Sequence, residues 1–155
     1  MKITELIAQH IIEVNEGNNW TEVDVNSTLN DVTLREAVTL TNASVNTIAS
    51  LVHHLMFWNR LMVQRINGVN IPEDEHNGYN VPQLATEEAW QQLKDDHLKS
   101  AQELATAIRA VDKNRLLSPI LPGYSSTYKN LQGSAEHIHY HLGQIVLLKQ
   151  LIRAS

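Results

Sequence analysis

Histidine is the residue type whose number and spacing in this chain point most directly to chemistry. Five of the eight histidines fall in two short clusters, His53-His54 and His137-x-His139-x-His141. The chain contains no cysteine, so thiolate metal sites, disulfides and cysteine nucleophiles are excluded. Any metal or catalytic centre must therefore use nitrogen and oxygen ligands, and the clustered histidines are the first candidates for these ligands.

The second cluster places two imidazoles on one side of a helix. At about 100° per residue, His137 and His141 project within about 40° of each other and continue an apolar stripe. Two histidines at this i, i+4 spacing can bind one metal ion. They can equally be hydrogen-bonded core residues. His139 projects from the opposite face, and we expect it to be exposed.

The first cluster offers a further ligand. His54 lies beside Trp58 and nearer the apolar stripe of its segment, whereas His53 points nearly away from that stripe. A metal held by His54, His137 and His141 would have three neutral nitrogen ligands from two facing helices. Coordination positions would stay open for water or substrate, which is typical of catalytic rather than structural sites.

Other side chains are expected near this site. Tyr140 and Gln144 lie within one helical turn of His141, and we expect Gln144 to orient a ligand or to pack against one. His97 occupies the middle of another apolar stripe, where a core or rim position is favoured over a role as fourth ligand. His10 is interpreted in the same way. No residue is assigned a catalytic role beyond metal binding.

Four amphipathic segments must position these residues. Helical spacing of apolar residues predicts helices over 2–16, 43–67, 86–111 and 134–153. Long connections separate the first helix from the second and the third from the fourth, with one helical turn expected near Thr33–Glu36 and a solvated loop from Val69 to Leu84. No segment resembles a strand. The pattern predicts an all-α four-helix bundle that forms a single domain over residues 1–155.

Composition limits the possible partners. The formal charge is -5, with 12 Lys+Arg against 17 Asp+Glu and no basic run, so nucleic acid is not an expected partner. No apolar stretch approaches the roughly 20 residues needed to cross a bilayer, and we expect a cytoplasmic protein without membrane contact. A second apolar stripe, formed by Val52, Met56 and Val63, lies away from the centre of the predicted core and predicts a homodimer contact.

The histidine motifs resemble those of a known family. The run Gly133–Ile145, GSAEHIHYHLGQI, is similar to the signature G-x-x-x-H-x-x-Y-H-x-G-Q-I of the DinB-like family of damage-inducible four-helix bundle proteins. The run His53–Asn59, HHLMFWN, resembles the second-helix motif of that family, in which a ligand histidine precedes a tryptophan by four residues. Further similarity at Asn19–Val23, at Leu29–Val32 and around Trp90 extends the resemblance over nearly the whole chain.

The resemblance implies a divalent metal such as Zn²⁺ or Ni²⁺ on His54, His137 and His141, and it implies frequent homodimers. Characterised relatives in this family include thiol-cofactor S-transferases, a mycothiol-dependent isomerase and a metal-dependent hydrolase. Membership of this family therefore does not determine which reaction, if any, a protein catalyses. This chain has Ile138 where many members carry an acidic or amide residue, which removes a polar role at that position.

Three hypotheses for function follow. The first is a metal-dependent enzyme of thiol S-transferase or hydrolase type that acts on a small-molecule substrate, with a low-molecular-weight thiol as cosubstrate in the transferase version. The second is a non-enzymatic metal-binding or stress-response protein, since Glu136 is the one carboxylate within a turn of the ligands and faces away from them. The third is a metal-free helical bundle that acts through its surface.

Overall fold

Four long helices form the frame of the molecule, near the positions that the spacing predicts. In the computed structural model, which describes residues 2–155, they are α1 (Ile3–Glu16), α4 (Ile48–Ile66), α5 (Glu87–Arg109) and α6 (Thr127–Ala154). Short helices α2 (Val25–Leu29), α3 (Leu34–Ala37) and the 3₁₀ turn η1 (Lys113–Arg115) lie in the connections. No strand occurs in this range, so the all-α class is confirmed. Met1, the first residue of the predicted domain, lies outside the described residues.

Two predicted helix starts are wrong. We expected the last helix to begin at Ser134, but it begins seven residues earlier, where the Ser126 hydroxyl accepts a hydrogen bond from the Lys129 amide. Gly133 therefore lies inside α6 and does not precede it. The second long helix begins at Ile48 instead of residue 43, because Thr47 supplies the cap through its side chain. In both cases a capping hydroxyl, not the apolar pattern, decides the boundary.

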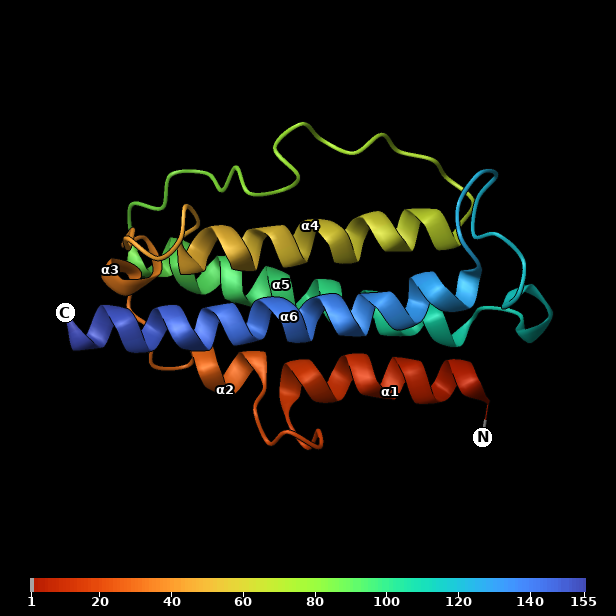
Figure 1. Cartoon of the computed structure of the whole chain (residues 1–155), viewed down its shortest axis with the longest axis horizontal. Coiled ribbons are helices and arrows are strands. Elements are labelled where there is room, and N and C mark those ends of the chain that lie inside the picture. Colours follow the sequence, from red (N-terminus) through yellow and green to blue (C-terminus); the bar gives the residue numbers. More distant parts are fainter. Residues whose placement is uncertain (1) are drawn as a thin grey trace.

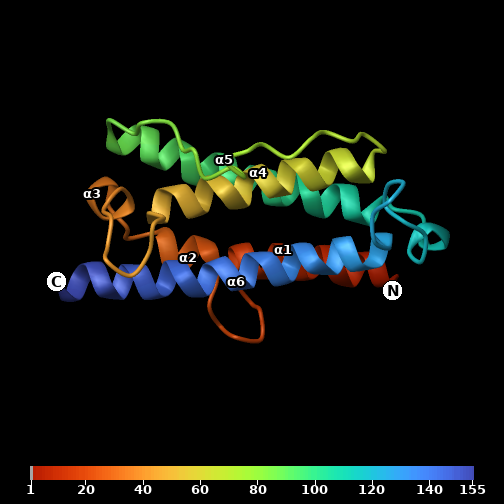
Figure 2. The ribbon, with the colours of Figure 1, turned by 45° about the horizontal axis from the view of Figure 1, so that its top comes forward.

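The long helices lie side by side along the length of the molecule (Figures 1 and 2). α4 contacts α5 and α6, and α1 contacts the same two helices. α4 and α5 run in the same direction, so the segment 67–86 between them must return along the whole of α4, roughly 28 Å. The connection before α6 stays near one end, whereas the connection before α4 runs from the middle of the molecule, where α1 ends, to the end at which α4 begins. The segment interpreted as a simple solvated loop is therefore the crossover of the fold.

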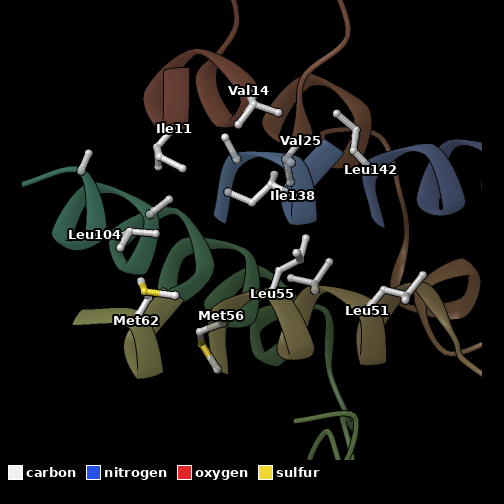
Figure 3. Close-up of a cluster of buried hydrophobic side chains, with 14 of the residues drawn as sticks. Ile11, Val14, Val25, Leu51, Leu55, Met56, Met62, Leu104, Ile138 and Leu142 are labelled. Carbon is white, nitrogen blue, oxygen red and sulfur yellow. The ribbon is translucent and has the colours of Figure 1, made fainter. Parts of the chain in front are cut away.

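The core is filled by aliphatic side chains from all four long helices. Figure 3 shows Ile11 and Val14 of α1 facing Ile138 of α6, with Leu104 and Leu55 beneath them. All five are fully buried. Burial of each such side chain contributes about 1.5–3 kcal/mol to stability, so this core can hold functional side chains in fixed positions. None of the helices described in residues 2–155 has the length and hydrophobicity that a membrane span requires.

The stripe that predicted a homodimer contact is not an exposed surface. Val52 and Met56 are 0% and 7% exposed, and Val63 is half-buried. α4 packs against both α5 and α6, and the crossover covers more of it, so little of this helix faces solvent. These residues belong to the core of one chain, and the homodimer remains an expectation without this support.

Candidate metal centre

Three histidines from two helices meet in the groove between α4 and α6. His54 comes from the middle of α4, and His137 and His141 lie one turn apart on α6. One ring nitrogen of each lies within 4.8 Å of those of the other two. The Nε2 atoms of His54 and His137 are 2.9 Å apart, and the His141 ring centroid lies 4.6 Å from both other rings. The sequence predicted this trio, and the structure brings its members together.

Hydrogen bonds outside the cluster orient two of the rings. The Nδ1 atom of His54 lies 2.5 Å from the carbonyl oxygen of Asn77, which can only accept, so Nδ1 carries the proton. The Nδ1 atom of His141 lies 2.6 Å from Oε1 of Gln144, which also accepts. In both rings the lone pair is therefore on Nε2, which in His54 is the atom that contacts His137. This is the arrangement that metal-binding histidines use, with the second nitrogen bonded to an oxygen.

Burial keeps the imidazoles neutral. Desolvation, helped by the neighbouring imidazoles, lowers the pKa of His54 to about 4 and that of His137 to about 3. Desolvation also lowers the pKa of His141, against an opposing effect of the Gln144 hydrogen bond. Only the neutral form of histidine has a lone pair for a metal. All three rings are therefore in the ligand form at neutral pH, and the donor set fits a divalent ion that accepts imidazole, such as zinc or nickel.

The crossover segment supports the cluster from outside, which sequence reasoning missed. Tyr79 stacks on His54, with ring centroids 4.0 Å apart and an interplanar angle of 4°. Besides the contact of its carbonyl with His54, Asn77 accepts a hydrogen bond from Trp58 Nε1 through its side chain at 2.9 Å. No periodic pattern in 69–84 reveals these contacts, because they depend on where the chain returns across α4.

Gly78 allows the crossover to approach α4 closely. Its φ of +75° lies in the left-handed region, and a Cβ atom built there would come within 2.6 Å of the Phe57 side chain. Its carbonyl oxygen lies 2.7 Å from Nδ1 of His53. His53, which the sequence analysis placed away from the apolar stripe, therefore binds the crossover and lies outside the three-histidine cluster.

The cluster opens into a cavity of about 470 Å³ between α4, α6 and the crossover. Trp58 and Tyr140, both predicted near the site, line it together with the three histidines. Polar and cationic groups that the sequence analysis did not single out also line it: Asn59, Arg65, Asn77, Tyr79, Ser125, Lys129, Asn130 and Ser134. None of the lining residues found in the described chain is an aspartate or glutamate.

The other histidines lie elsewhere. His97 is 2% exposed, and its Nε2 lies 2.8 Å from Oδ1 of Asn15 in the core, so the structure gives it a core position and leaves it out of the cluster. His139 is half-buried instead of exposed as expected, because its Nε2 lies 2.9 Å from that of His10 on α1. The fourth-ligand interpretation of His97 therefore finds no support in the geometry.

Comparison with known proteins gives one match. A family model described as the DinB superfamily matches residues 19–145, a range that includes all three clustered histidines. No curated protein and no solved structure matches the chain significantly.

Proposed function

The chain belongs to the DinB superfamily, and on that premise we propose that it is a metal-dependent enzyme acting on a small molecule. The observation that carries the proposal is the convergence of three neutral histidines at the wall of a cavity large enough for a substrate. Within this proposal the long helices α1, α4, α5 and α6 form a single four-helix bundle domain. His54, His137 and His141 are the metal ligands, and Zn²⁺ or Ni²⁺ is the ion.

Different residues of the chain would bind the metal, orient its ligands and contact the substrate. The three imidazoles hold the ion, while Asn77 and Gln144 keep each Nε2 lone pair directed at it. When bound, a divalent ion with open positions lowers the pKa of a bound water or thiol towards neutrality and so supplies a nucleophile. Trp58 and Tyr140 give the substrate apolar walls beside the site. Removal of any ligand would lower metal occupancy and activity together.

The reaction has two versions. In the S-transferase version a low-molecular-weight thiol attacks an electrophilic substrate, and in the hydrolase version water does. The lining carries no carboxylate in the part of the chain that the structure describes. A thiol needs less help from a general base than water does, because its ordinary pKa lies much closer to neutrality. This difference favours the transferase version.

The metal is tested first. Untagged protein is purified, and its metal content is measured by inductively coupled plasma mass spectrometry beside the double variant His137→Ala/His141→Ala. We expect about one divalent ion per chain, lost in the variant. A matched control, His10→Ala/His139→Ala, removes two histidines outside the cluster and should leave this ion in place. Metal-free protein after reconstitution with Zn²⁺ and Ni²⁺ would refute the proposal.

Activity is tested on the same proteins. Consumption of small thiols is followed in the presence of electrophilic substrates, and ester and amide hydrolysis is followed without thiol. Metal-loaded wild-type protein should exceed the His54→Ala variant in one of the two assays. Equal rates for the two proteins in the thiol assay would exclude the transferase version.

A non-enzymatic role for the metal is the second candidate, and the lack of a carboxylate in the cavity lining favours it, since no general base is provided. In this case the ion stabilises the fold or reports metal status. Chelation would then lower the melting temperature, because a ligand that binds only the native state stabilises it. A metal-loaded protein whose melting temperature does not respond to chelation would exclude this role.

A further inference from the structure

A cationic region lies in the same cavity, away from the three histidines. Arg65 and Lys129 are the charged side chains of the described lining, and both are positive. Arg65 follows His54 by eleven residues, three helical turns along the same face of α4. Lys129 lies in the first turn of α6, two turns before His137. Because α4 and α6 are antiparallel, these two cations lie towards the same end of the groove.

Arg65 is buried and has unused hydrogen-bond donors. The residue is 4% exposed, and its guanidinium carbon lies 5.3 Å from the Trp58 ring and 4.8 Å from the Tyr124 ring. Its one hydrogen bond within residues 2–155 runs from Nη2 to Oε1 of Glu73 at 2.7 Å, and its buried Nε has no partner. A guanidinium carries five N–H donors, and buried donors without partners are costly. The side chain is thus held in a fixed position but not satisfied.

The charges at this end are not balanced. Glu73 compensates one of the two positive charges, and its own side chain is half exposed. Lys129 has no carboxylate partner among the described residues. Among the two lining cations and the one carboxylate that pairs with them, one positive charge remains, which matches a monoanion such as a carboxylate better than a doubly charged phosphate group. Arg65 is suited to a carboxylate, because its planar fork can donate two parallel hydrogen bonds.

From this charge and these unused donors, we infer that Arg65 and Lys129 bind a carboxylate, so that the substrate class is a small carboxylate-bearing molecule. That the other end of the same substrate reacts at the three histidines rests on the proposed function. Trp58 lies between the two ends, since its ring is 5.3 Å from the Arg65 guanidinium carbon and 5.8 Å from the His137 ring. A substrate that lies along the indole would place its carboxylate at the cations and its reacting group at the histidines.

The carboxylate site is tested first without metal. Metal-free protein labelled with ¹⁵N is titrated with adipate and with adipamide, which has the same chain length but no charge. Adipate should shift the NMR signal of the Arg65 Nε–H group, and adipamide should not. The affinity for adipate should fall about tenfold in Lys129→Met and in Arg65→Met. Lys99→Met, which removes an exposed lysine outside the cavity lining, should bind adipate like the wild type.

Two results would overturn the inference: equal binding of adipate and adipamide by the wild type, or unchanged adipate affinity in Lys129→Met. Lys129 is exposed, so this variant should fold even if the loss of buried Arg65 prevents folding of the other.

A second titration separates this inference from the metal proposal. Zinc-loaded protein is titrated calorimetrically with adipic monohydroxamate, which has a metal-chelating group at one end and a carboxylate at the other, and with its uncharged methyl ester. The acid should bind about tenfold more tightly than the ester, and Lys129→Met should abolish this preference. If both bind equally, the carboxylate site is refuted while the metal centre stands. If the ester does not bind and the acid binds no more tightly than adipate binds metal-free protein, the metal centre fails and the carboxylate site stands.

Discussion

Replacement of Gln144 by leucine should weaken metal binding without removing a ligand. Gln144 accepts a hydrogen bond from Nδ1 of His141 at 2.6 Å. In metal-free protein the His141 ring can respond to the loss by carrying its proton on Nε2. Once Nε2 is a metal ligand, the proton must stay on Nδ1. His141 is 4% exposed, so water cannot readily replace the lost acceptor. The loss of this acceptor therefore destabilises the metal-bound state and not the metal-free state.

The structure sets the size of this effect. A buried N–H group without a partner costs about 1–3 kcal/mol, which corresponds to about 5- to 150-fold weaker metal affinity. Zinc affinity is measured by competition with a chromogenic chelator for the wild type and for Gln144→Leu, Gln144→Glu and Gln150→Leu. The glutamate variant keeps the acceptor and should bind at least as tightly as the wild type. Gln150 is an exposed residue of the same helix, and its replacement should have no effect.

An affinity of Gln144→Leu within twofold of the wild type would show that the Gln144 contact does not orient His141 for a metal. The far-ultraviolet circular dichroism of the metal-free variants confirms that the comparison is between folded proteins.

Three further predictions concern single residues. His54→Ala should lose the metal measured by mass spectrometry and His53→Ala should keep it, because His53 binds the Gly78 carbonyl outside the cluster. Gly78→Ala should lower the free energy of unfolding in urea by about 1–3 kcal/mol and weaken zinc binding in chelator competition, because its Cβ would clash with Phe57 and displace the crossover. Burial lowers the pKa of His97 from 6.5 to about 4, so the unfolded chain binds the extra proton and stability is lost as the pH falls from 6.5 towards 4. The loss reaches about 3 kcal/mol at pH 4. In urea unfolding over this range, His97→Gln should show a shallower pH dependence than the wild type, and an equal slope would contradict a neutral buried imidazole.

The cavity was less predictable than the histidine cluster. Arg65 and Lys129 have no distinguishing spacing, and an arginine near the end of a helix is ordinarily a solvated residue that favours the helix dipole. Arg65 is buried only because Trp58, Tyr124 and Glu73 enclose it, and two of these come from connections. One signal was available: Arg65 has the same angular position on the helix as His54, which predicts that both face one groove.

The amino-acid pattern by itself determined the four long helices, apart from where two of them begin, and the identity of the clustered histidines. Both depend on local periodicity: apolar residues at helical spacing mark the four long helices, and the i, i+4 spacing puts His137 and His141 on one face. The sequence also favoured His54 over His53 as a ligand, because neighbouring residues on a helix point about 100° apart.

Only the tertiary structure decided how these faces meet. The crossover from 67 to 86 returns along α4 and carries the Asn77 carbonyl and the Tyr79 ring to His54. The same packing placed Val52 and Met56 in the core instead of on a dimer surface, and bonded His139 to His10. These contacts join residues far apart in the chain, and they depend on the direction of each helix and the path of each connection. Local spacing carries no information on either, since it records the face of a helix but not the partner that covers it.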